Sequence, residues 1–331
     1  MPGHGLRDAV PVRPSPLPDE LGPGPFSTAE ALRLGVPPQR LTRSDLVHPT
    51  RGARAAVAPS SLLERARAYQ VALPGQRAFS HLTAAVLWGL PLPRGLEDAA
   101  SAVDAPLHVM ARTSDGMARR RGVVGHRGLE WRAVASPPGL GLRVVDVPDT
   151  WCDLGELRRG LLSLTDLVVA GDAAVAILDA RAGRAVGLAA LREALRHRNR
   201  PRGAVALRQA LSQVRAGVRS PMESRARLMF VSAGFPEPEV NAPLTSSSGE
   251  WLGEGDLVWR PQRLVGEYQG EHHAARRRRS EDAFRRALVE DHGWRLKELW
   301  AEDVRRGARR VATLTSFARA LDLAPATLRI A

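Results

Sequence analysis

The chain has 331 residues, 44% of them hydrophobic and 25% charged, which predicts two or three domains with ordinary hydrophobic cores. It carries 48 lysine and arginine residues against 35 aspartate and glutamate residues, and this net charge of +13 favours polyanionic partners. The single cysteine, Cys152, excludes a disulfide framework and fits a reducing cytoplasm, and the lack of a long apolar run argues against a membrane span.

The N-terminal region changes character after its first 25 residues. Residues 1–25 are rich in proline and glycine and lack periodicity, so we expect a disordered tail. Ser27 with Glu30 predicts a helix cap, a second short helix follows, and the basic residues 51–54 predict a small wing. Residues 26–60 are therefore predicted to form a winged-helix-like module, and they resemble the N-terminal region of type IV abortive-infection antitoxin proteins. An αα-hairpin that packs on the rest of the chain is the alternative.

The next stretch, residues 61–203, is predicted to form a mixed α/β middle region. Periodicity predicts helices over residues 61–70 and 80–90, strands over 107–110 and 123–127, and helices over 150–161, 167–177 and 188–197. Residues 168–172, Val-Val-Ala-Gly-Asp, are interpreted as a turn within the last group, because glycine and aspartate favour turns. His81 is interpreted as a hydrogen-bonding residue near a helix cap, and Cys152 as a core residue.

The most informative stretch is residues 253–270, which predict a tight hairpin of two apolar strands. Asp256 opens the first strand and Glu267 closes the second, so a hairpin brings the two carboxylates together. Side chains alternate along a strand, so Glu267 and Gln269 point to the same face. Converging hard oxygen ligands predict a site for Mg²⁺ or Mn²⁺.

Helices are predicted on both sides of this hairpin. Upstream, Ser220 is a capping residue, Pro221 fits the first helical position, and Glu223 sits where a capping box has Glu or Gln. Downstream, four consecutive arginines precede a helix, and a strand is predicted over residues 294–300. The predicted order over the C-terminal domain, residues 204–331, is helix, strand, strand, helix, strand.

The combined pattern resembles the very-short-patch-repair-endonuclease-like branch of the PD-(D/E)xK nuclease superfamily, over roughly the last third of the chain. The matching residues are Ser-Pro-Met-Glu223, Asn241, Gly-Glu-Gly-Asp256-Leu-Val-Trp, Val-Gly-Glu267-Tyr-Gln269-Gly-Glu-His-His273, Asp282, Arg285 and Gly293-Trp294. The resemblance implies an α/β (α+β) restriction-endonuclease-like fold, with a mixed sheet flanked by helices. It also implies hydrolysis of phosphodiester bonds with Mg²⁺ or Mn²⁺ as cofactor.

The resemblance assigns roles to particular residues. Asp256 and Glu267 are the implied metal ligands, and Glu223 is a helix carboxylate that completes or orders the site. Gln269 stands where the superfamily has its lysine, which removes a positive charge from the implied site. His272 or His273 is a candidate general base or a residue that orients water.

Positive charge near the site has two sources in the sequence. Lys297, the only lysine, could serve from a neighbouring strand. Five arginines suit phosphate binding: Arg276, Arg277, Arg278, Arg279 and Arg285. Each residue also has a plain structural interpretation, with Asp256 as a turn residue, Glu223 as a helix cap and the arginines as a solvated helix face.

These features predict a metal-dependent DNA endonuclease, in DNA repair or in defence against phage and mobile elements. The alternative is a non-catalytic DNA-binding regulator, an antitoxin-like repressor with a degenerate nuclease fold, which Gln269 favours. A third possibility, an RNA-processing nuclease, is not separated from DNA cleavage by any residue pattern.

Overall fold

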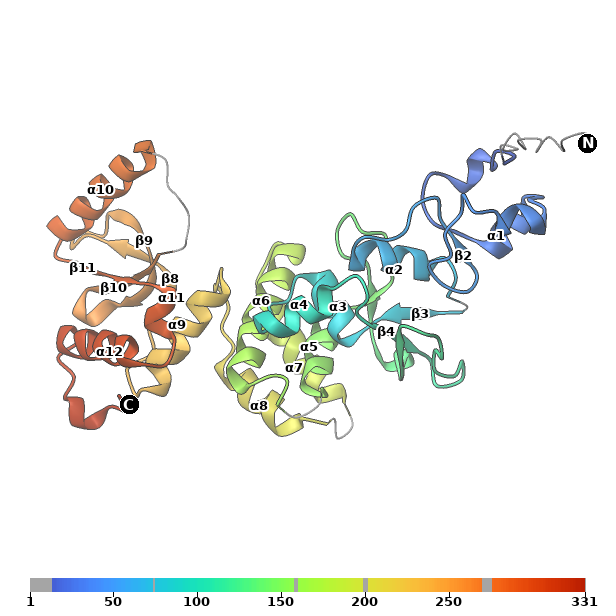
Figure 1. Ribbon diagram of the computed structural model, residues 1–331. Helices are drawn as coiled ribbons and strands as arrows, with labels where there is room; N and C mark the ends of the chain where they lie inside the picture. Colours follow the sequence, from blue (N-terminus) through green and yellow to red (C-terminus); the bar gives the residue numbers. More distant parts are fainter. Residues whose placement is uncertain (1–13, 74, 158–159, 199–201, 270–275, 331) are drawn as a thin grey trace, which may run out of the picture. The chain divides into compact units, whose positions relative to one another are not determined.

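The computed structural model describes residues 14–73, 75–157, 160–198, 202–269 and 276–330, with the backbone alone at 276–282 and 325. The chain divides into two compact units, Met1–Trp88 with Gly95–Asp146, and Gly89–Arg94 with Val147–Ala331. Both units are mixed α/β structures, with helices around mixed sheets (Figure 1). No helix in the described part of the chain has the length and apolar character needed to cross a membrane.

The first unit begins with a small module around a two-stranded sheet. Its elements are η1 (Asp19–Leu21), β1 (Phe26–Ser27), α1 (Thr28–Arg33), η2 (Pro38–Thr42) and β2 (Ala53–Arg54). β1 and β2 pair antiparallel, so the strand before α1 is joined to the basic segment expected to form a wing. The Ser27 side chain accepts a hydrogen bond from the Glu30 N–H, which confirms the predicted cap. The predicted second helix is a short 3₁₀ helix.

Part of the predicted N-terminal tail belongs to this module. Leu17 and Leu21 pack against its core cluster of five buried residues: Phe26, Ala31, Val36, Leu41 and Leu46. The expectation of a disordered tail through residue 25 is therefore wrong for residues 14–25. Residues 1–13 lie outside the described part of the chain.

The rest of the first unit is built on a five-stranded mixed sheet. Its elements are α2 (Leu62–Gln70), β3 (Arg77–Phe79), α3 (His81–Trp88), α4 (Arg94–Ser101), β4 (Leu107–Ala111), β5 (Val123–Arg127), η3 (Leu129–Trp131), β6 (Val134–Ala135) and β7 (Val144–Val145). The strand order is β5-β4-β3-β7-β6, with β4–β5 and β3–β7 parallel and the other pairs antiparallel. The two predicted helices and two predicted strands of this region are confirmed.

The second unit begins with four helices, α5 (Val147–Gly155), α6 (Leu164–Ala182), α7 (Gly187–His197) and α8 (Ala204–Gln213). The turn predicted over residues 168–172 is wrong, because these residues are buried inside α6. Gly171 serves close packing there: a Cβ at this position would lie 2.5 Å from the Val214 Cγ2 atom and 3.0 Å from the Trp151 Nε1 atom. The main division of the chain thus falls at 146/147, and residues 147–203 belong with the C-terminal sheet.

The C-terminal part of the second unit holds the predicted hairpin within a four-stranded mixed sheet. Its elements are α9 (Pro221–Ser232), β8 (Glu239–Thr245), β9 (Trp251–Trp259), η4 (Arg260–Gln262), β10 (Leu264–Tyr268), α10 (Arg276–Asp291), β11 (Arg295–Leu299), α11 (Ala301–Val304), α12 (Ala308–Ala320) and η5 (Pro325–Thr327). The strand order is β11-β10-β9-β8, with β10–β11 parallel and the other pairs antiparallel. The predicted order of elements missed β8, because Pro243 interrupts its strand pattern. Proline is tolerated in β8 because that strand lies at the edge of the sheet.

Helices cover both faces of this sheet, with α10 on one face and α9 and α12 on the other (Figure 1). Val258 and Val265 pack under Val289 of α10. On the opposite face, Trp259 packs with Phe230 of α9 and Phe317 of α12 and with its strand neighbours. Two apolar layers therefore fix the sheet between its helices and leave the ends of the strands to carry polar side chains.

Candidate functional site

The two carboxylates of the hairpin project from neighbouring strands on one face of the sheet. β9 and β10 pair from Leu264↔Trp259 to Gly266↔Leu257, and the next residues along the two strands are Glu267 and Asp256. Alternation along each strand places them on the face that α10 covers, together with Val265 and Val258. Asp256 lies in the interior of β9, so the expectation that it opens the strand is wrong.

Both carboxylates line one cavity of about 430 Å³. Its walls come from β9, β10, the start of the following segment, β11 and α10. The lining residues are Asp256, Glu267, Tyr268, Gln269, Ala283, Arg285, Arg286, Leu296 and Glu298. The structure thus brings four of the sequence-predicted site residues to one place: Asp256, Glu267, Gln269 and Arg285.

Burial and the charge of a neighbouring carboxylate raise the pKa of both carboxyls. For Asp256 the largest cause is burial, which the hydrogen bond from the Tyr268 N–H opposes, and the Glu223 charge raises the pKa further. For Glu267 burial again comes first, Arg285 opposes it, and the Asp256 charge raises the pKa. Two half-buried carboxylates that repel each other are a donor set that fits a divalent cation such as Mg²⁺, which takes one or two carboxylates and keeps several waters.

Glu223 lies in the first turn of α9 and is buried. Its Oε2 atom accepts hydrogen bonds from the Asn241 side chain at 2.7 Å and from the Arg219 N–H at 3.0 Å. Its backbone N–H donates to the side chain of Ser220, the helix cap. Glu223 therefore orders the start of α9 and the nearby Asn241, and its charge acts on Asp256, but it is not among the residues that line the cavity.

The carboxylates Glu223, Asp256 and Glu267 do not gather tightly. In the part of the chain that the structure describes, one set of three or more histidine, cysteine or carboxylate side chains lies close enough to hold a metal ion, and it consists of His81, His108 and His126 in the first unit. A cation in the carboxylate cavity would therefore depend on Asp256 and Glu267, with the remaining ligands supplied from outside these side chains.

Two arginines of α10 bring positive charge to the cavity. The Arg285 Nη2 atom donates to the Glu267 Oε1 atom at 3.0 Å and to the Glu254 carbonyl at 2.9 Å. The neighbouring Arg286 pairs with Glu298 of β11 at 2.8 Å. Arg285 keeps 46% of its side chain exposed, so a ligand in the cavity can reach it.

The single lysine lies on the other face of the sheet. The Lys297 ammonium donates to the Ser316 hydroxyl at 2.8 Å and lies 5.7 Å from the centre of the Phe317 ring, both on α12. The hypothesis that Lys297 serves the site is therefore wrong. Glu298 is the charged residue of β11 that lines the cavity, beside Leu296 of the same strand, and it is the register partner of Glu267. The sequence analysis did not identify Glu298 or Arg286 as site residues. Alternation along the strand places Glu298 on the same face as Leu296, so the sequence does contain a signal for Glu298.

Some predicted site residues cannot be placed. His272 and His273 lie outside the described residues. The backbone of the four consecutive arginines forms the first residues of α10, and their side chains lie outside the described part: Arg276, Arg277, Arg278 and Arg279.

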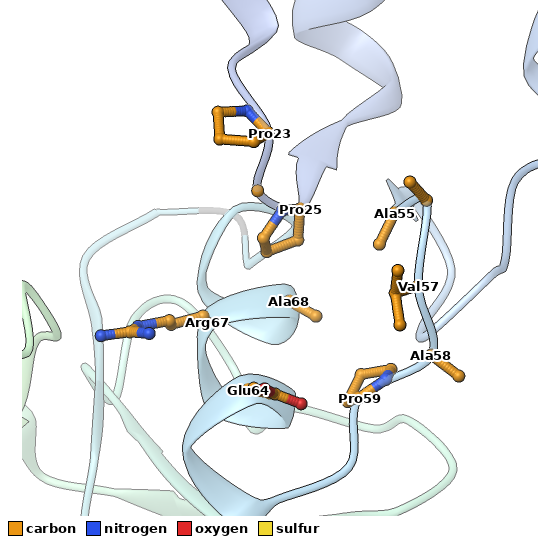
Figure 2. Close-up of a pocket in the computed structure, with 11 residues that line it drawn as sticks. Pro23, Pro25, Ala55, Val57, Ala58, Pro59, Glu64, Arg67 and Ala68 are labelled. Carbon is orange, nitrogen blue, oxygen red and sulfur yellow. The ribbon is translucent and has the colours of Figure 1, made fainter.

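A second cavity lies in the first unit, between the N-terminal module and α2 (Figure 2). It measures about 200 Å³ and is lined mainly by proline, alanine and valine side chains. Its carboxylate, Glu64, already accepts hydrogen bonds from the Ser60 N–H and hydroxyl. Beside Glu64, the lining contains one further charged residue, Arg67, so the cavity presents no cluster of catalytic or metal-binding side chains.

Two curated proteins of Mycobacterium tuberculosis are similar to part of the chain. They are the uncharacterized protein MT2308 of strain CDC 1551 / Oshkosh and the uncharacterized protein Rv2248 of strain ATCC 25618 / H37Rv. Each is 36% identical over 124 residues, which are 37% of this chain and 45% of the relative, so the chain spans less than half of either. No family model matches the chain. No solved structure matches it either.

Proposed function

We propose that the protein is a metal-dependent endonuclease that hydrolyses DNA phosphodiester bonds. The observation that carries this proposal is the placement of Asp256 and Glu267 on adjacent strands, half-buried, in one cavity with two arginines of α10. The four-stranded mixed sheet with helices on both faces supports a restriction-endonuclease-like fold. The net charge of +13 supports a polyanionic substrate.

Asp256 and Glu267 would hold a divalent cation, which when bound would activate water and neutralise charge on the phosphate. Gln269 lines the same cavity and offers an amide that can orient water through hydrogen bonds. Arg285, which is half-exposed and bonded to Glu267, is placed to donate to a phosphate oxygen. His273 is proposed to orient the attacking water or to act as general base.

Other parts of the chain have supporting roles in this proposal. The module of residues 26–60 is proposed to be winged-helix-like and to position DNA, and the arginines at the start of α10 to contact phosphates. A cytoplasmic role in DNA repair or in defence against mobile elements is the setting that the resemblance suggests.

The test is cleavage of supercoiled plasmid, single-stranded DNA and RNA with Mg²⁺ or Mn²⁺. Wild type is compared with Asp256→Asn and Glu267→Gln, each of which removes one charge from the cavity and keeps the side-chain shape. We expect metal-dependent nicking that falls by roughly 100-fold or more in both variants, because each removes charge stabilisation from the reacting centre.

Glu239→Gln is the matched control, because Glu239 is an exposed carboxylate of the same sheet that pairs with Arg260 outside the cavity. This variant should cleave like wild type. The enzyme proposal fails if no substrate is cut by wild type, or if nicking persists unchanged in both cavity variants. Faster cleavage of RNA than of DNA would support the same catalytic site with RNA as its substrate.

One set of observations favours a second function, a non-catalytic DNA-binding regulator. Gln269 brings no positive charge to the cavity, and Lys297 is turned to the opposite face. Glu223 is engaged by Asn241 and Arg219 rather than gathered with the other carboxylates. Intact DNA binding in wild type and in both cavity variants, without cleavage by any of them, would establish this second function.

A further inference from the structure

Three histidines of the first unit lie together although they are far apart in the sequence. His81 begins α3, His108 lies on β4 and His126 on β5. Each offers one ring nitrogen to a group in which all three nitrogen atoms lie within 4.8 Å of one another. None of these residues belongs to the carboxylate cavity, which is in the second unit.

Two hydrogen bonds fix the backbone of His108 against the start of α3. The Ser80 N–H donates to the His108 carbonyl at 3.0 Å, and the His108 N–H donates to the Thr83 hydroxyl at 2.9 Å. The carbonyl and the N–H of His108 on β4 are thus both hydrogen-bonded to residues at the start of α3. Because β4 and β5 pair in parallel, with Met110 opposite His126, His108 and His126 are diagonal neighbours on one face.

The backbone of His81 is in an uncommon conformation. Its φ angle is +49°, in the left-handed region that residues other than glycine seldom adopt, and the side chain is buried. Such a conformation persists only where the surroundings over-determine it, and it occurs preferentially at functional sites. Here it accompanies a ring that stacks on His126, with ring centres 3.6 Å apart.

The chemistry of the cluster suits a metal ion of borderline softness. A neutral imidazole keeps a lone pair on one ring nitrogen, and histidine is the commonest side-chain ligand of such metals. The His108 Nδ1 and His126 Nε2 atoms are 3.0 Å apart. Nitrogen ligands at about 2.0–2.1 Å from a tetrahedral Zn²⁺ lie roughly 3.3 Å from one another. The three histidine nitrogens lie within 4.8 Å of one another, so the rings reach that spacing by turning.

We propose that His81, His108 and His126 form a binding site for a divalent transition metal of the Zn²⁺ class, with a fourth coordination position left to water. Imidazole ligands favour Zn²⁺ over Mg²⁺, which prefers oxygen, so this site and the carboxylate cavity take different ions. Metal binding requires the stacked rings of His81 and His126 to turn so that their lone pairs converge. The bound ion would clamp α3 to β4 and β5.

The test uses the full chain with Asp256→Asn and Glu267→Gln, so that the carboxylate cavity does not contribute to binding. After treatment with a chelator, the protein is titrated with Co²⁺ and the visible absorption of the bound ion is recorded, followed by displacement with Zn²⁺. We expect one equivalent to bind, with the spectrum of a four-coordinate Co²⁺ ion held by three nitrogens and one water. His126→Ala and His108→Ala should each weaken binding by more than about 100-fold, since even outer ligand partners contribute about 10–100-fold.

His197→Ala is the matched control, because His197 is an exposed histidine that pairs with Glu193, and its titration should be unchanged. Thermal melting in chelator checks that each variant is folded, and Zn²⁺ should raise the Tm only of the proteins that keep His81, His108 and His126, the His197→Ala control included. His126→Asn gives a polar variant if the alanine variant does not fold. The proposal is overturned if the histidine-intact protein binds no stoichiometric Co²⁺ or Zn²⁺, or if folded variants at His108 and His126 bind as it does.

Discussion

At the scale of single residues, the cavity of the second unit combines acidic and basic groups, and these groups are not paired one to one. Burial raises the pKa of both Asp256 and Glu267, the Asp256 charge raises that of Glu267 further, and Arg285 pairs with Glu267 alone of the two. Gln269 lies beside them in the lining and contributes no charge. A basic residue at this position would add to the positive charge that Arg285 and Arg286 bring to the cavity.

Gln269→Lys should increase metal-dependent cleavage if the protein is an endonuclease. An ammonium group in the cavity would stabilise the negative charge of the reacting phosphate, and a preorganised group of this kind contributes roughly 10-fold or more in rate. The measurement is the single-turnover rate of plasmid nicking for Gln269→Lys and for the shape control Gln269→Met. An unchanged or lower rate in the lysine variant, with Mg²⁺ affinity preserved, would contradict the prediction.

At the scale of elements, a buried polar network joins the helices of the second unit to its sheet. Arg227 of α9 donates to Asp172 of α6 at 3.1 Å, to the Gln213 carbonyl at the end of α8 and to Glu237 before β8. The side chains of Arg227 and Asp172 are each only 1% exposed. Ser224 donates a further hydrogen bond to Asp172 at 2.7 Å. This network explains why α6 stays with the C-terminal sheet.

Arg227→Ala should lower the free energy of unfolding of the second unit by about 3–5 kcal/mol, because it leaves the Asp172 carboxylate buried without its cation. Arg260→Ala is the control, since it breaks an exposed pair with Glu239 and should cost only about 0–1 kcal/mol. Denaturant unfolding followed by tryptophan fluorescence measures both. Equal effects of the two substitutions would show that the buried network does not stabilise the unit.

At the scale of the whole molecule, the helices of residues 147–203 belong to the same compact unit as the C-terminal four-stranded sheet. A fragment of residues 147–331 keeps α5–α8 with the sheet, whereas a fragment of residues 204–331 loses α6 and exposes the buried face of α9. We expect the longer fragment to fold and to melt at a higher temperature than the shorter one, because only it keeps the Asp172–Arg227 and Asp166–Arg225 pairs. Circular dichroism melting of both fragments measures this.

The full chain serves as the reference for these fragments, because its second unit should melt at a temperature close to that of the longer fragment. A shorter fragment that is as stable as the longer one would place the domain boundary at 203/204, where the sequence suggested it. Melting of both fragments well below the full chain would instead show that residues 89–94, which the second unit also contains, are needed for its stability.

Features that depend on neighbouring residues were predictable from the sequence. The cap at Ser220, the proline at the first position of α9 and the two strands of the hairpin follow from local propensity and alternation. Strand alternation also put Asp256 and Glu267 on one face, because the hairpin leaves little choice of register. These elements form where the local pattern and the tertiary packing agree.

Features that depend on distant residues were decided by the tertiary structure alone. The parallel pairing of β10 with β11 selects Glu298 for the cavity and turns Lys297 to the opposite face, and a shift of one residue would exchange them. Gly171 lies within a helix because Val214 and Trp151 leave no room for a Cβ there. The three histidines meet only because α3 is bonded to β4 beside β5. Local spacing carries no record of such long-range register and packing, so the sequence by itself determined the elements and the folded chain determined which side chains meet.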